Sequence, residues 1–117
     1  MILILSADAT GAALLGALIE TLGYSVAFAR ARESGEESLR RTRPKVCLVD
    51  CADRSRYNDE FLGRTAMRGI AVVIFGSSEA LSQIRALALA HDLDTILVPP
   101  DTAALAETLE RAMAGAR

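Results

Sequence analysis

The stretch Arg43-Pro44-Lys45-Val46-Cys47-Leu48-Val49-Asp50 decides the fold of this chain. Its apolar run Val46–Val49 contains no polar residue, which is typical of a strand that is buried on both faces. Pro44 disfavours helix at Arg43 and so separates this strand from the helical pattern before it. Asp50 then ends the run with a carboxylate. A parallel sheet covered by helices on both sides satisfies this pattern.

Similar apolar runs recur on both sides of this stretch and predict four further strands: Ile2–Leu5, Ser25–Ala29, Ile70–Phe75 and Thr95–Val98. Helical patterns lie between and after the strands: Ala9–Leu22, Glu33–Arg41, Tyr57–Met67, Glu79–Ala90 and Thr102–Ala114. Strict alternation of strands and helices predicts an α/β domain with right-handed crossovers. We expect one domain over residues 1–117.

Polar residues stand where helices of this kind should begin. Asp8 precedes the first helical pattern and is predicted to cap it, and Asp101 precedes the last one. Ser77 and Ser78 are the predicted caps of the fourth helix. Gly23 follows the first helix and is predicted to end it.

Composition limits the functions that the chain can have. Among its 117 residues, 51% are hydrophobic and the net charge is -2, so no basic face for nucleic acid is expected. No apolar run approaches the roughly 20 residues of a membrane-spanning helix, and the apolar start lacks the basic region of a signal peptide. Cys47 and Cys51 are expected to be reduced. We therefore expect a cytoplasmic protein without membrane contact.

The stretch that ends at Asp50 resembles the third strand of response regulator receiver domains, which ends in the phosphate-accepting aspartate. The first strand, the amphipathic helix and Leu22-Gly23-Tyr24 are similar to the first unit of that family, and Pro99-Pro100 stands where receivers usually have Lys-Pro. The resemblance implies a flavodoxin-like (CheY-like) (βα)5 three-layer sandwich whose five-stranded parallel sheet has the order 2-1-3-4-5. It also implies a signalling module of a two-component phosphorelay.

Several positions depart from the receiver pattern. Asp50 matches the phosphoacceptor, but Ser6 and Ala7 occupy the positions of the two metal-binding acids, and Asp8 follows one residue later. The resemblance thus makes Asp8 and Asp50 the candidate metal ligands. Other receiver positions are also replaced: the hydroxyl residue by Gly76, with Ser77 just after it, the aromatic switch residue by Ile96, and the lysine by Pro99.

These replacements weaken the expected chemistry. Phosphoryl transfer needs positive groups around the phosphoryl oxygens, and Mg²⁺ is usually held by one or two carboxylates together with waters and phosphate. We expect no cofactor, at most weak Mg²⁺ binding, and slow or absent phosphorylation of Asp50. Asp50 could alternatively cap the following turn, or serve recognition without phosphorylation.

Three functions stay open at this point. The first is a pseudo-receiver that acts by protein–protein interaction, and the second is a phosphorylatable receiver with a metal site rebuilt from Asp8 and Asp50. The third is an unrelated small enzyme or ligand-binding domain of flavodoxin-like fold; no nucleophile, base and oxyanion donor occur together, so we do not expect an enzyme. The expected partners are a sensor kinase or an output protein. The apolar helix Ala80–Ala90 further predicts a homodimer through the region Glu79–Ala114.

Overall fold

Five parallel strands form the central sheet of the computed structural model, which describes residues 1–116. The strands are β1 (Ile2–Leu5), β2 (Val26–Phe28), β3 (Val46–Asp50), β4 (Ala71–Gly76) and β5 (Asp94–Leu97). Their order is β2-β1-β3-β4-β5, and every neighbouring pair is parallel. The predicted fold class, a five-stranded flavodoxin-like sheet of order 2-1-3-4-5, is confirmed.

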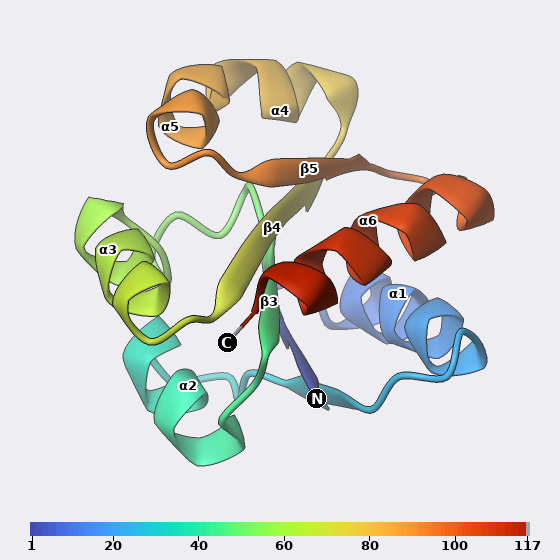
Figure 1. Ribbon diagram of the computed structural model, residues 1–117, viewed down its shortest axis with the longest axis horizontal. Helices are drawn as coiled ribbons and strands as arrows, with labels where there is room; N and C mark the ends of the chain where they lie inside the picture. Colours follow the sequence, from blue (N-terminus) through green and yellow to red (C-terminus); the bar gives the residue numbers. More distant parts are fainter. Residues whose placement is uncertain (117) are drawn as a thin grey trace.

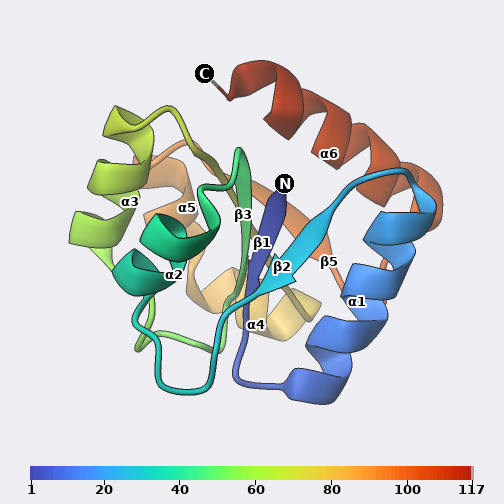
Figure 2. The same ribbon diagram turned by 90° about the horizontal axis from the view of Figure 1, so that it is seen from below.

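Helices cover both faces of this sheet (Figures 1 and 2). They are α1 (Ala9–Thr21), α2 (Gly35–Thr42), α3 (Asp59–Met67), α4 (Ser78–Gln83), α5 (Arg85–Ala90) and α6 (Thr102–Gly115). Helices α1 and α6 lie on one face, while α2, α3 and the α4–α5 pair lie on the other. None of these described helices is long and apolar enough to cross a membrane.

The side chains of the strands pack into two hydrophobic clusters, one on each face of the sheet. Ile2 and Ile4 of β1 pack with α1 and α6, whereas Leu3 and Leu5 pack with α2 and α3. Because successive side chains of a strand point to opposite faces, a strand in the middle of this sheet is apolar at every position. This is the reason why the run Val46–Val49 contains no polar residue, and all its side chains are buried.

The fourth predicted helix is wrong in one respect: residues 79–90 do not form a single helix. Ile84 has φ −109° and ψ 15° and separates α4 from α5. Its side chain is only 8% exposed and packs in the cluster with α2 and α3. Its amide donates to the carbonyl of Leu81 at 3.2 Å, three residues back, so the helical ladder is interrupted where the side chain is buried.

Two other helices begin later than predicted because a polar residue caps them. Ser34 accepts from the amide of Glu37 in a capping box, so α2 starts at Gly35 instead of Glu33. Asn58 accepts from the amide of Phe61, so α3 starts after the buried Tyr57.

Four of the remaining predicted caps are confirmed, whereas Ser78 does not cap α4 but is its first residue. Asp8, Ser77 and Asp101 each accept a hydrogen bond from the first turn of the helix that follows. Gly23 follows the end of α1 with φ +96°, a conformation that favours glycine. These caps fix where the loops at the carboxyl edge of the sheet turn into helices.

Candidate functional site

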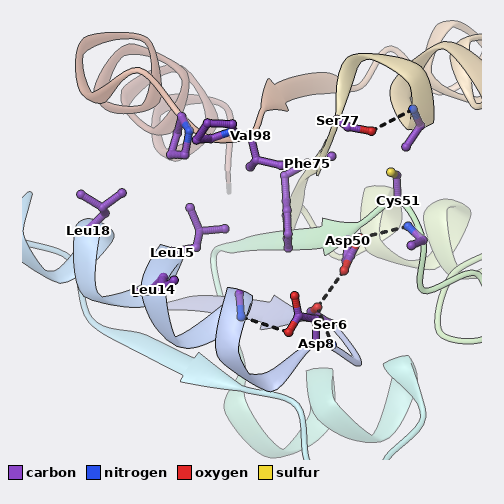
Figure 3. A pocket seen from close by; sticks show the side chains of 16 residues that line it. Ser6, Asp8, Leu14, Leu15, Leu18, Asp50, Cys51, Phe75, Ser77 and Val98 are labelled. Carbon is purple, nitrogen blue, oxygen red and sulfur yellow. Dashed lines mark hydrogen bonds between the residues drawn. The ribbon is translucent and has the colours of Figure 1, made fainter.

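Asp50 is the last residue of β3, the central strand of the sheet, and its side chain is half-buried at the carboxyl edge. Ligands of parallel sheets bind outside this edge. Register pairs Leu5 with Val49 and Asp50 with Phe75, so the loops after β1 and β4 flank the carboxylate. Figure 3 shows these loops with Ser6, Asp8, Cys51 and Ser77 around Asp50.

Both carboxylate oxygens of Asp50 accept a hydrogen bond. The hydroxyl of Ser6 donates to Oδ2 at 2.8 Å, and the amide of Ala52 donates to Oδ1 at 3.0 Å. The amide of Asp53 donates to the backbone carbonyl of Asp50 at 2.9 Å. Asp50 therefore caps the turn after β3, as one of the sequence-based alternatives proposed, while its side chain still lines a cavity.

Ser6 connects the two acidic residues of the site. Its Oγ accepts from the amide of Asp8 at 3.1 Å while its hydroxyl donates to Asp50. Asp8 in turn uses Oδ1 to accept from the amide of Gly11 at 3.1 Å. The Ser6 hydroxyl therefore fixes the position of the Asp50 carboxylate, and one carboxylate oxygen of Asp8 caps α1.

Gly76 ends β4 and lies against Cys51. A Cβ atom at position 76 would be 2.3 Å from the Sγ atom of Cys51, closer than side chains approach each other. The thiol therefore fills the volume that a side chain at position 76 needs, and a hydroxyl residue fits there only if Cys51 moves. Ser77, the next residue, uses its hydroxyl oxygen to accept from the amide of Ala80.

Burial and charge keep Cys51 protonated. Desolvation, followed by the nearby charge of Asp50, raises the pKa of the Cys51 thiol. Tyr57 stabilises the turn after β3, because its hydroxyl donates a hydrogen bond to the carbonyl of Cys51 at 2.7 Å. Burial also raises the pKa of Tyr57. Both residues therefore contribute packing and hydrogen bonds rather than reactive anions.

A cavity of about 530 Å³ opens beside Asp50. Asp8 and Asp50 are its only charged residues among the described lining, and neither lysine nor arginine lines it. Its remaining walls are mainly apolar and include Leu14, Leu18 and Pro99. The site can therefore receive positive charge and apolar groups but offers no cation to an incoming anion.

The predicted site positions separate into two groups. Ser6, Asp8, Gly76, Ser77 and Pro99 all line this cavity together with Asp50. Ala7 and Ile96 do not: Ala7 lines a smaller cavity next to α1. Ile96 is 5% exposed and packs in the cluster with α1 and α6.

The side chains that could bind Mg²⁺ at this site are two carboxylates and one hydroxyl. Among residues 1–116 no group of three or more His, Cys, Asp and Glu side chains is placed to hold a metal ion. Asp50 and Asp8 supply two carboxylates, and each already accepts a hydrogen bond. Ser6 adds a neutral oxygen that is bonded to both residues. Mg²⁺ sites usually combine one or two carboxylates with waters and phosphate, so Asp8 and Asp50 are the residues that could hold the ion, without a third acidic partner among residues 1–116.

The sequence-based reasoning missed Cys51 and the leucines of α1 as site residues. The sequence predicts an ordinary reduced cysteine at position 51, yet its Sγ atom occupies the volume that a side chain at position 76 needs. A signal did exist, because glycine at the end of a strand often marks a close approach of another group. Leu14 has helical spacing to Leu18 in the sequence, but its side chain is 67% exposed and lines the cavity.

Comparison with known proteins rests on structure alone. No protein-family model matches the chain, and no curated protein matches it significantly. The receiver domain of NtrX from Brucella abortus superposes with a TM-score of 0.77 at 16% identity, covering 97% of this chain and 98% of that one.

Two other solved structures are similar. The receiver domain of a sensor histidine kinase from Pseudomonas aeruginosa, with a magnesium ion coordinated in its active-site cleft, has a TM-score of 0.72 at 22% identity, covering 97% and 96% of the two chains. A pilus assembly-related protein from Burkholderia pseudomallei has a TM-score of 0.73 at 22% identity, covering 99% of this chain and 90% of that one. At these identities the likeness establishes architecture: the chain has the CheY-like fold of response regulator receiver domains.

Proposed function

We propose that this chain is a receiver-like signalling module that acts by protein–protein interaction, is not an enzyme, and has impaired or absent phosphorylation at Asp50. One observation carries the proposal. The cavity beside Asp50 contains the carboxylates of Asp8 and Asp50 and no basic side chain among its described lining. The receiver-like fold supplies the class of function, and this charge distribution argues against its usual chemistry.

The charge distribution opposes phosphoryl transfer for a physical reason. Negative charge develops on the phosphoryl oxygens, and catalysis consists mainly of positioning groups that stabilise it. Here those oxygens would meet a second carboxylate, Asp8, while Pro99 has neither charge nor a donor at the end of β5. Loss of one well-placed donor costs about 3 kcal/mol, and several are missing together.

Interaction surfaces remain available to such a module. Leu89 at the end of α5 is 75% exposed and Leu97 at the end of β5 is 55% exposed. Both line one hollow of about 390 Å³ between α4–α5 and β5. Large exposed apolar side chains that share one surface favour a protein contact. We propose that the region Glu79–Ala114 forms a homodimer, and that a sensor kinase or an output protein is the partner of the module.

The decisive experiment is exposure to a small phosphodonor. The protein is incubated with acetyl phosphate and Mg²⁺ and measured by intact mass spectrometry. We expect no species heavier by one phosphoryl group, since no lysine or arginine among residues 1–116 lines the cavity to balance the phosphoryl charge.

A phosphorylated species that disappears in Asp50→Asn would overturn this proposal. That result would instead support the alternative of a phosphorylatable receiver that uses Asp50, with Asp8 and Mg²⁺ in a rebuilt site. A phosphorylated species that persists in Asp50→Asn would place the modification elsewhere and leave Asp50 unphosphorylated, as proposed.

A further inference from the structure

The cavity beside Asp50 extends well beyond that residue. It runs along α1 to Leu18 on one side and to Val98 and the following prolines on the other. Its volume of about 530 Å³ lies in the range of roughly 300–1,000 Å³ that is typical of small-molecule sites. An Mg²⁺ ion or a phosphoryl group would occupy only a small part of it.

The cavity has a polar end and an apolar end (Figure 3). Oxygen atoms of Ser6, Asp8 and Asp50 gather at one end, and Leu18 and Val98 lie toward the other. Mainly apolar walls with a few convergent polar groups are the usual composition of a ligand pocket. The polar end can bind a polar group of a ligand, and the apolar end can bind the apolar part of the same ligand.

Charge at the polar end is uncompensated within the described lining. Asp8 and Asp50 form no ion pair among residues 1–116, and no lysine or arginine lines the cavity. An ionised carboxylate accepts about four hydrogen bonds, whereas Asp50 accepts one at each oxygen. Its free lone pairs are complementary to a group that is both positively charged and a hydrogen-bond donor.

We propose that this cavity binds a small organic monocation whose ammonium group contacts Asp50 and Asp8 and whose apolar body lies against Leu14, Leu18 and Pro99. An anion of the same shape is repelled by the two carboxylates. An inorganic cation leaves the apolar walls in contact with water. Only a ligand that combines a positive head with an apolar body satisfies both ends. The inference goes beyond the proposed function, because it requires neither phosphorylation nor a protein partner.

The test uses three probes of defined chemistry on the full chain: 2-phenylethylammonium, the similarly shaped 3-phenylpropanoate, and Mg²⁺. Amide chemical shifts in ¹H–¹⁵N NMR spectra report where each probe binds and how tightly. We expect the ammonium probe to shift the amides of Gly11, Ala52 and Ser77 and to bind at least about tenfold more tightly than the carboxylate probe, because only the former pairs with Asp50.

Substitutions separate the two ends of the cavity. Asp50→Asn keeps a side-chain oxygen that can accept from Ser6 but removes the negative charge. The affinity for the ammonium probe should therefore fall about tenfold. Leu14→Asn removes part of the apolar wall at a side chain that is 67% exposed, so folding should be unaffected while binding weakens severalfold. Met67→Asn, at a side chain that is 89% exposed and outside this cavity, is the matched control and should leave binding unchanged.

Several results would overturn the inference. Equal binding of the ammonium and carboxylate probes would show that charge does not select the ligand. Shift changes away from the cavity, or unchanged ammonium binding in Asp50→Asn, would place the probe elsewhere. Binding of Mg²⁺ without binding of the ammonium probe would identify a plain cation site. None of these outcomes bears on phosphorylation, which the intact-mass experiment decides separately.

Discussion

At the scale of single residues, Cys51 and Gly76 share one small volume at the carboxyl edge of the sheet. The Sγ atom of Cys51 would lie 2.3 Å from a Cβ atom at position 76, and both residues are buried. Gly76 does not have a positive φ angle, so the backbone itself would accept another residue. A side chain at this position therefore requires the thiol of Cys51 to move.

Gly76→Ala is expected to lower the free energy of unfolding by about 1–3 kcal/mol, because a methyl group forced into a packed region displaces its neighbours. Urea denaturation measures the change. In Cys51→Ala the sulfur is gone, so adding Gly76→Ala to that variant should cost much less than it does alone. The difference between the two costs is the coupling energy of the pair.

Gly63 provides the matched control, because it lies within α3 and nothing stands within 4 Å of its potential Cβ atom. Gly63→Ala should stabilise the protein by up to about 1 kcal/mol through helix propensity. If Gly76→Ala were equally harmless, or if Cys51→Ala gave no rescue, the volume conflict at the site would be disproved.

At the scale of elements, Glu33 organises the connection between β2 and α2. Its carboxylate accepts from Arg41 Nη2 at 2.8 Å, from the amide of Arg30 at 2.9 Å and from the hydroxyl of Ser38 at 2.9 Å. The hydrogen bond from Arg41, followed by that from the Arg30 amide, lowers the pKa of Glu33 from 4.5 to about 2. The Glu33 carboxylate thus connects the loop after β2, through Arg30, with α2, through Ser38 and Arg41.

The depressed pKa makes the contribution of Glu33 dependent on pH. A carboxyl group whose pKa is lower in the folded state stabilises the protein fully above its unfolded value, here 4.5, and the stabilisation is lost as the pH falls toward 2. Glu33→Gln should therefore unfold at a lower urea concentration than the unmodified protein at neutral pH. The difference between them should narrow as the pH falls below 4.5.

Glu110→Gln, at an exposed position of α6, serves as the control and should show no such pH-dependent difference. A difference between Glu33→Gln and the unmodified protein that stayed constant from neutral pH to about pH 2.5 would contradict the prediction. It would mean that the hydrogen bonds do not depend on the charge of the carboxylate.

The elements differ in how far the sequence predicts them. Strand Val46–Val49 is predictable, because burial on both faces requires an uninterrupted apolar run. The break at Ile84 is not predictable, since Leu81, Ile84 and Leu87 keep helical spacing and only packing against the sheet reveals the turn. At the site, the positions of Ser6 and Asp50 at the carboxyl edge of the sheet are predictable, because each residue lies at the end of a predicted strand.

The contact of Cys51 with Gly76 joins two strands and therefore needs the sheet register, which pairs Asp50 with Phe75. No local pattern in the sequence contains that information. The same holds for the cavity, whose walls come from α1, β3, β4 and the segment after β5. The end of each strand can be predicted from the local sequence. The cavity between the strand ends cannot, because its shape depends on how all the strands are arranged.

At the scale of the whole molecule, helices cover the two faces of the sheet, whereas its edge strands are partly exposed. β5 is an edge strand of the sheet, and Leu97 at its end is 55% exposed. Leu89 of α5 borders the same hollow. Figure 1 shows the α4–α5 pair beside β5, so the two leucines belong to one side of the molecule. A second copy placed there would cover both.

We expect the protein to form a dimer whose dissociation constant rises at least about tenfold in Leu89→Glu and in Leu97→Glu, because each substitution places a charge in an apolar contact. Light scattering over a range of concentrations measures the dimer. Met67→Glu, at an exposed methionine that ends α3 outside this hollow, is the matched control and should leave the dimer intact. All three side chains are more than half exposed, so the substitutions should not disturb folding. A protein that stayed monomeric at every concentration, or a dimer disrupted by Met67→Glu and not by the two leucine variants, would rule out this surface as the interface.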